Sequence, residues 1–171
     1  MEKEHRHMLI AIEIAIQMEK DGKQFYLQAA DVSSNEVGKS LFKKLAAEED
    51  IHLSNFVTIY DSIRADQGWP VIELKTGELE EETLFSAAEK DIIATRGELE
   101  AIKQAMDMEN KTVDYYAEQS GKVQYETAKK FYNLLTEEER KHHQVLLDYY
   151  EYVQDPAGWF TMKEHHSLDG G

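Results

Sequence analysis

Two short motifs in the chain pair a glutamate with a histidine three residues later. Glu49 and His52 form one pair, and Glu139 and His142 form the other. Residues at i and i+3 lie on the same face of a helix, so each pair could bind a metal ion. Carboxylate oxygen and imidazole nitrogen are ligands that suit iron and manganese. The same spacing also occurs twice within residues 1–7, so the motif alone indicates little.

An internal repeat indicates that these two Glu-x-x-His pairs are not coincidental. When the chain is shifted by 90 residues, positions 9–60 align with 99–150 without a gap, and 14 of 52 positions are identical. Unrelated sequences would share roughly one position in fifteen. The repeat includes three polar pairs on predicted inward faces, which are Glu19/Glu109, Glu49/Glu139 and His52/His142. Burying an unpaired carboxylate is costly, so both halves must gain something from these residues.

The repeated polar residues form a ligand set that is used by di-iron and di-manganese helical bundles. In such bundles two helices each supply one glutamate, and two others each supply a Glu-x-x-His pair. The predicted ligands are Glu19, Glu49, His52, Glu109, Glu139 and His142. Their four carboxylates would neutralise two divalent ions, and carboxylates can bridge two ions.

Two tyrosines share the spacing of the repeat. Tyr26 and Tyr116 follow Glu19 and Glu109, respectively, by seven residues, which is nearly two helical turns. We therefore expect each hydroxyl group to point into the same interior and to hydrogen-bond a ligand carboxylate. The alternative is that both are ordinary core tyrosines that bond elsewhere.

The segments that carry these residues are predicted to be four long helices. Their expected bounds are about 8–31, 36–66, 96–120 and 123–154. Apolar residues recur every three or four positions in them, and helix-forming residues dominate. Proline occurs only at Pro70 and Pro156, outside these segments. A short helix is expected around Leu84 to Lys90.

The connections between the helices predict the topology. Short turns give two antiparallel hairpins, about 8–66 and 96–154, and the long segment 67–95 can run the length of a bundle between them. These features predict an all-α, antiparallel four-helix bundle with one long crossover between two pseudo-repeated hairpins. We expect residues 1–171 to form a single domain, in which 155–171 is a C-terminal tail.

Composition excludes several classes of function. The formal net charge is −15, so neither nucleic acid nor an anionic membrane is expected as a partner. The chain has no cysteine, which excludes disulfides, thiolate zinc sites, iron–sulfur clusters and cysteine nucleophiles. The apolar stretch from Met8 to Ile12 is too short for a signal sequence or a membrane span. We therefore expect a cytoplasmic protein.

The motifs together resemble the ferritin-like di-iron domain of rubrerythrins. The matching segments are residues 17–26 with 47–52 and, in the second half, 108–116 with 137–142. The resemblance covers about 9–154. It implies a ferritin-like bundle with two iron ions per chain, for which manganese or zinc could substitute. It also implies an oxidoreductase of peroxidase or ferroxidase type that reduces hydrogen peroxide or reacts with dioxygen.

The chain departs from that family in two respects. Without cysteine it cannot form a rubredoxin iron site, so electrons would come from a separate donor such as a rubredoxin-like protein. Thr112 stands where many rubrerythrins have an additional glutamate, which weakens the transfer of their peroxidase mechanism. Because ferritin-like bundles often pair, the resemblance also implies a homodimer or a higher homo-oligomer.

Two other functions use the same centre. One is an iron-binding, ferroxidase or storage protein without a peroxidase role, and the other is a di-iron hydroxylase with an apolar substrate pocket at the metals. Trp69 and Trp159 are expected to cap the bundle or to bury an interface. The histidines outside the predicted centre are expected to be surface or tail residues, and they are His5, His7, His143, His165 and His166.

Overall fold

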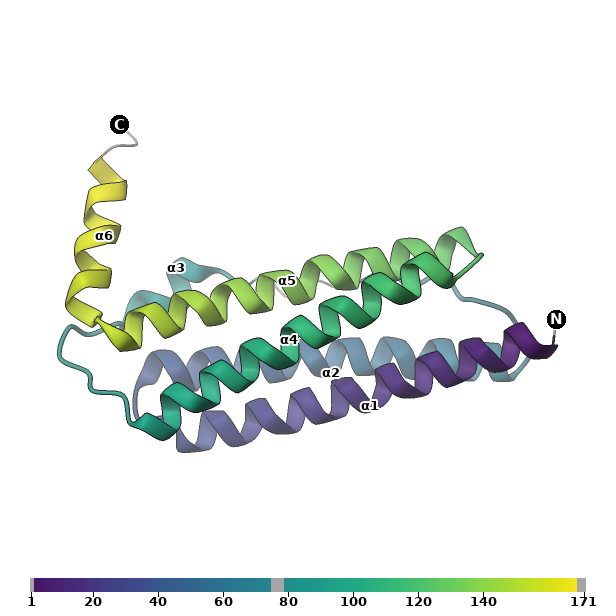
Figure 1. The fold of residues 1–171 in the computed structure, drawn as a ribbon, viewed down its shortest axis with the longest axis horizontal. Helices are drawn as coiled ribbons and strands as arrows, with labels where there is room; N and C mark the ends of the chain where they lie inside the picture. Colours follow the sequence, from purple (N-terminus) through teal and green to yellow (C-terminus); the bar gives the residue numbers. More distant parts are fainter. Residues whose placement is uncertain (1, 75–78, 169–171) are drawn as a thin grey trace.

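A computed structural model describes residues 2–74 and 79–168, and four long helices dominate it. They are α1 (Glu2–Val32), α2 (Glu36–Arg64), α4 (Arg96–Lys122) and α5 (Glu126–Gln154). Figure 1 shows the hairpin of α1 and α2 beside the hairpin of α4 and α5. These described residues contain no β-strand. The predicted ferritin-like, antiparallel four-helix bundle with one long crossover is confirmed.

Side chains at the helix starts fix the two hairpins. The Oδ1 atom of Asn35 accepts a hydrogen bond from the Gly38 N–H at 2.9 Å and caps α2. Thr95 and Glu98 form a capping box at the start of α4. The Glu98 carboxylate also accepts a hydrogen bond from the Ser34 N–H at 2.6 Å. This bond joins the start of the second hairpin to the turn of the first.

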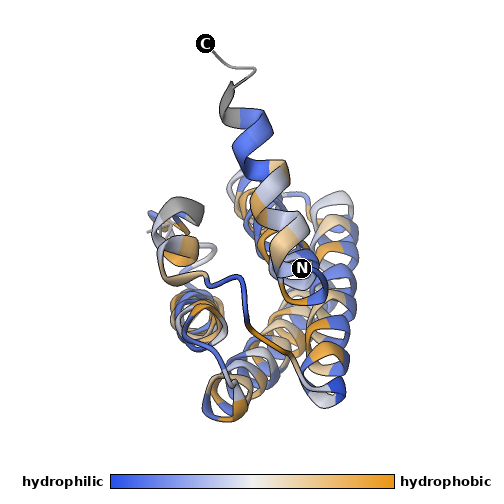
Figure 2. Ribbon diagram, turned by 90° about the vertical axis from the view of Figure 1, so that its left-hand side faces the viewer, coloured by the Kyte–Doolittle hydropathy of each residue, from blue (hydrophilic) through white to orange (hydrophobic). Residues whose placement is uncertain are grey.

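The core consists of two apolar clusters, and a layer of polar residues lies between them. Ile12, Ala15 and Leu135 belong to one cluster, while their repeat counterparts Ile102, Ala105 and Leu45 belong to the other. The two hairpins are thus related by a pseudo-twofold arrangement. Figure 2 shows hydrophobic residues on the sides of the helices that face one another. The six polar residues and the two tyrosines that were predicted to point into the interior are all buried.

The described part of the C-terminal tail is largely helical, a feature that the sequence analysis did not assign. Residues Pro156–Leu168 form α6, which stands away from the bundle axis in Figure 1. Proline is favoured in the first turn of a helix, and Asp155 accepts a hydrogen bond from the Gly158 N–H at 3.0 Å. The ring of Trp159 lies 5.3 Å from that of Tyr152 and caps this end of the bundle.

Smaller differences concern element boundaries. The short helix expected around Leu84 to Lys90 begins earlier, as α3 (Glu81–Leu84) followed by the 3-10 helix η1 (Phe85–Ala87). The first helix begins at Glu2 instead of near residue 8, and α4 ends at Lys122 instead of near residue 120. Within the described ranges, no helix has the length and apolarity required to cross a membrane.

Candidate metal centre

The six predicted ligands meet in the middle of the bundle. Glu19 comes from α1, Glu109 from α4, and one Glu-x-x-His pair each from α2 and α5. All six side chains are buried, with exposed fractions between 0 and 4%. The interior register predicted from the 3–4 spacing therefore brings all of them to one place, where they form the polar layer between the two apolar clusters.

The six residues form two groups that share two glutamates. One group is Glu19, Glu49, His52 and Glu139, and the other is Glu49, Glu109, Glu139 and His142. Within each group, one ligand atom per residue lies within 4.8 Å of the others. Because Glu49 and Glu139 belong to both groups, their carboxylates are placed to bridge two ions.

Glu139 lies between the two imidazole rings. Its Oε1 atom is 3.0 Å from His52 Nδ1, and its Oε2 atom is 2.9 Å from His142 Nδ1. The rings are nearly parallel, with centroids 5.7 Å apart. His142 Nδ1 is also 3.2 Å from Glu49 Oε1. The nitrogen atoms that could bind metal thus point at the shared carboxylates.

Unsatisfied polar atoms converge on this centre. Six of its buried atoms make no well-aligned hydrogen bond within the described part of the chain, although the two histidine nitrogens lie at ion-pair distance from Glu139. These atoms are Glu19 Oε2, Glu49 Oε1, both Glu139 oxygens, and Nδ1 of His52 and His142. Buried polar groups without partners are costly and rare, so such a cluster needs an explanation. Two divalent cations would satisfy these atoms and balance four carboxylate charges. The donor set therefore fits a dinuclear metal site.

Four of these residues, Glu49, Glu109, His52 and His142, have raised pKa values and so favour their protonated forms when no metal is bound. Burial and the neighbouring carboxylates raise the pKa of Glu49 well above its ordinary value, and burial raises that of Glu109 to about 8. Burial would also raise the pKa of Glu139, but His142 and His52 beside it hold that pKa well below its usual range. Burial would lower the pKa values of His52 and His142, yet Glu139 raises both. Binding metal must therefore displace protons.

The two predicted tyrosines bond across the hairpins. The Tyr26 hydroxyl on α1 donates to Glu109 Oε1 on α4, and the Tyr116 hydroxyl on α4 donates to Glu19 Oε1 on α1. Each tyrosine therefore contacts the glutamate of the other repeat, not the one seven residues before it. The unpartnered Oε2 atom of Glu19 is left free to face the centre. A role of these tyrosines in catalysis stays a prediction.

One residue of the site was not identified from the sequence. Glu48 is buried, and its Oε2 atom lies 3.1 Å from His142 Nε2, the ring nitrogen that faces away from the shared carboxylates. A carboxylate in this position fixes the orientation and tautomer of a ligand histidine. The repeat contained the signal, because Glu48 matches Glu138. Glu138 instead pairs with Lys141 at 2.9 Å.

We expect Glu48→Gln to weaken metal binding at the group that contains His142. Loss of such an outer carboxylate typically lowers metal affinity by about 10- to 100-fold. Competition titration with a coloured chelator would measure both binding steps. Glu138→Gln is the matched control, since its carboxylate is buried on the equivalent helix position but pairs with Lys141. Equal effects of the two substitutions would contradict the orienting role of Glu48.

The centre reaches the surface through a small opening between α1 and α4. This opening is a cavity of about 250 Å³ whose walls include Glu49 and Glu109. Its other lining residues are Met18, Asp21, Gly22, Met108, Lys111 and Thr112, which are three repeat-related pairs. A Cβ atom at Gly22 would lie 2.6 Å from Glu49 Oε2, so a larger residue here would force the Glu49 carboxylate to move.

Fold and site together define a ferritin-like bundle with a buried cluster of glutamates and histidines that is compatible with a dinuclear metal site. A family model described as Rubrerythrin matches residues 10–150. The chain belongs to the rubrerythrin family, in agreement with the resemblance seen in its motifs. Searches of the curated proteins and of the solved structures found no match.

Proposed function

We propose that the protein is a di-iron oxidoreductase of rubrerythrin type, which reduces hydrogen peroxide or reacts with dioxygen. The observation that carries this proposal is the pair of ligand groups that share Glu49 and Glu139, together with their unpartnered buried atoms. Six protein ligands would hold two iron ions per chain, and manganese or zinc could take their place. Electrons would come from a separate donor protein, because the chain lacks cysteine.

The bound ions would supply the electrons that reduce the oxidant. The chain positions and protonates the reacting groups. Burial, reinforced by nearby carboxylates, raises the pKa values of Tyr26 and Tyr116 well above the ordinary value, so both remain protonated. Each tyrosine hydroxyl keeps its proton while it donates a hydrogen bond to a ligand carboxylate. It can then donate this proton when the oxidant is reduced. The apolar clusters on both sides exclude water from the centre.

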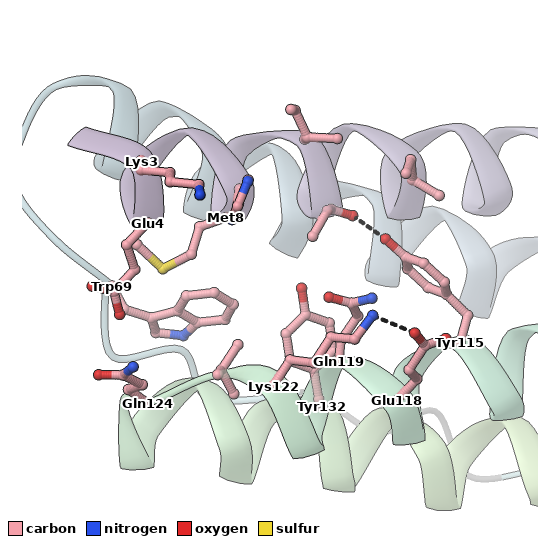
Figure 3. Close-up of a pocket in the computed structure, with 15 residues that line it drawn as sticks. Lys3, Glu4, Met8, Trp69, Tyr115, Glu118, Gln119, Lys122, Gln124 and Tyr132 are labelled. Atoms are coloured by element: carbon pink, nitrogen blue, oxygen red, sulfur yellow. Dashed lines mark hydrogen bonds and ion pairs between the residues drawn. The ribbon is translucent and has the colours of Figure 1, made fainter. Parts of the chain in front are cut away.

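The dimensions of the opening favour a small oxidant. The cavity between α1 and α4 is about 250 Å³, and the buried side chains of Glu49 and Glu109 form part of its lining. A hydroxylase would need an apolar pocket at the metals. A groove of about 860 Å³ lies at one end of the bundle (Figure 3), and the described residues that line it include none of the six ligands. This separation supports peroxide or dioxygen over an organic substrate.

Anaerobic loading with ferrous iron, followed by rapid mixing with peroxide or dioxygen, would test the proposal. We expect iron oxidation on mixing and continued peroxide consumption when a reduced rubredoxin-like donor is present. Accumulation of many irons per chain without reductant-dependent turnover would favour the alternative of an iron-binding or storage protein. Iron that is bound but inert to both oxidants would overturn the proposal.

Replacing either interior tyrosine should slow oxidant reduction without loss of metal. We expect Tyr26→Phe and Tyr116→Phe each to lower the peroxide rate by about 100-fold, the low end for a lost general acid. Iron content and rapid-mixing kinetics would be measured on the same samples. Tyr60→Phe is the control, because its hydroxyl bonds Glu13 on the exposed side of the hairpin. Unchanged rates in both interior variants would assign Tyr26 and Tyr116 to packing alone.

A further inference from the structure

A row of oxidisable aromatic rings leads from the candidate metal centre to one end of the bundle. Tyr116 donates its hydroxyl hydrogen bond to Glu19. The Tyr116 ring lies 6.0 Å from the ring of Tyr132, and Tyr132 lies 5.8 Å from Trp69. Tyrosine and tryptophan are the side chains that most readily lose and regain a single electron. The row therefore connects a ligand carboxylate to a tryptophan through redox-active groups alone.

The outer end of this row is open to solution. Trp69 and Tyr132 both line the groove of about 860 Å³ at the end of the bundle. Figure 3 shows the indole ring of Trp69 along the groove and the Tyr132 hydroxyl pointing into it. Trp69 is half-buried, so an electron donor in solution can approach its ring.

A second row starts from the other repeat but contains a break. Tyr26, which bonds Glu109, lies 6.1 Å from Phe42, and Phe42 lies 5.8 Å from Tyr149. Contacts through Tyr152 then lead to Trp159 at the opposite end. Phe42 is the repeat counterpart of Tyr132. Because phenylalanine has no hydroxyl group and is far harder to oxidise than tyrosine, the pseudo-symmetric bundle has one continuous row and one interrupted row.

We propose that Tyr116, Tyr132 and Trp69 form a relay that passes single electrons between the groove and the metal centre. The inference rests on the proposed function, which requires an external donor, and it adds the route. In the inward direction, once peroxide or dioxygen has oxidised the centre, Tyr116 would give it one electron and pass its phenolic proton to Glu19 Oε1. Tyr132 then reduces Tyr116, which takes back its proton, while Tyr132 releases its own proton to water in the groove.

Trp69 completes the cycle by reducing Tyr132, which regains a proton from that water. An external one-electron donor finally reduces Trp69. One electron has then moved from the donor to the centre, the donor is oxidised by one electron, and each ring has returned to its starting state. The second row cannot perform the same sequence, because Phe42 interrupts it.

Flash photolysis can test the relay in the reverse direction without peroxide. A ruthenium tris-bipyridine sensitiser with a sacrificial acceptor would oxidise the half-buried tryptophans of the ferrous protein, and transient absorption would follow their radicals. We expect two phases in the decay of the tryptophan radicals. In the fast phase, ferrous iron reduces the Trp69 radical through the relay, and the slow phase is the decay of the Trp159 radical. Trp69→Phe should remove the fast phase, and its matched control Trp159→Phe should remove only the slow one.

Two further variants address the middle of each row. Tyr132→Phe deletes one hydroxyl group and should slow the fast phase several-fold, while Phe42→Tyr should speed the slow phase by completing the second row. The relay would be overturned if Tyr132→Phe left the rate of the fast phase unchanged, or if the fast phase depended on Trp159. Circular dichroism and iron content would be measured for every variant.

The failure of the proposed function would be seen separately. A chain that binds iron but does not react with peroxide still gives the two phases if the relay exists. If the chain binds no iron, the relay can still be tested in the metal-free protein. In that form the tryptophan radical should convert into a tyrosine radical at Tyr116, with Glu19 as the proton acceptor, and the conversion must require both Trp69 and Tyr132.

Discussion

Replacing Glu49 and Glu139 together by alanine will abolish the binding of both metal ions. Each of these carboxylates belongs to both ligand groups, so the double variant leaves each group with one glutamate and one histidine. Two ligands are too few to hold an iron or manganese ion in competition with water. A single substitution at Glu19 or Glu109 removes a ligand from one group alone and should weaken one binding step.

Metal content after anaerobic loading with ferrous iron and gel filtration would measure this effect. We expect about two ions per chain for the native sequence, as its two ligand groups indicate, and well below one for the double variant. Asp50→Ala/Glu137→Ala is the matched control, because it also removes one carboxylate from α2 and one from α5, both of them exposed and paired with Lys23 and Arg140. Metal binding that persists in the Glu49/Glu139 variant would show that the interior cluster is not the site.

The buried positions of the candidate ligands could be predicted from the sequence, because a physical conflict marks them. Glu19 and Glu49 occur at positions where the 3–4 rhythm requires buried apolar residues, and the repeat places Glu109 and Glu139 at the equivalent positions. Chance produces single exceptions to apolar patterning, but it does not repeat them in register. The four long helices could be predicted equally well from the sequence, because apolar residues recur at every third or fourth position over many turns, with charged residues between them.

Other features could not be predicted, because they depend on how the hairpins meet. Spacing within one helix placed Tyr26 near Glu19, whereas the structure bonds Tyr26 to Glu109 across the bundle. Glu48 lies next to Glu49, about 100° further around the helix, so a single-face pattern assigns it to the outside. It is buried because His142 from the other hairpin lies against it. In α6, Pro156 and Gly158 suggested a break, although proline suits the first turn of a helix.

The metal-free protein should lose stability as the pH rises from about 5 to 8. Glu49 and Glu109 have raised pKa values in the folded state, about 8 for Glu109, whereas an unfolded glutamate titrates near 4.3. The folded chain therefore binds more protons than the unfolded chain across this interval. His52 and His142, whose pKa values are also raised, act in the same direction above about pH 6.5.

The sign follows from proton linkage. The free energy of unfolding falls with pH wherever the folded state holds more protons, by about 1.4 kcal/mol per pH unit for each extra proton. Glu139 acts in the opposite sense, since its pKa is lowered, but its contribution is lost only as the pH falls below about 4.5. Between pH 5 and 8 the groups with raised pKa values therefore determine how the free energy of unfolding changes with pH.

Metal binding should reverse this dependence. Because an ion displaces the protons held by Glu49, Glu109 and the two histidines, its affinity rises with pH, and so does the stability that it confers on the folded state. Urea unfolding at several pH values between 5 and 8, with chelator or with redox-inert manganous ion, would measure both slopes. We expect the free energies of unfolding with manganous ion and with chelator to differ more and more as the pH rises.

The same double variant supplies the control. Glu49→Ala/Glu139→Ala removes one raised carboxyl group together with the carboxylate that raises both histidine pKa values, so its metal-free slope should be shallower. Added manganese should leave its unfolding curve unchanged. If the metal-free native protein instead became more stable from pH 5 to 8, the interior carboxylates would be ionised without metal, and the centre would not need cations to balance its charge.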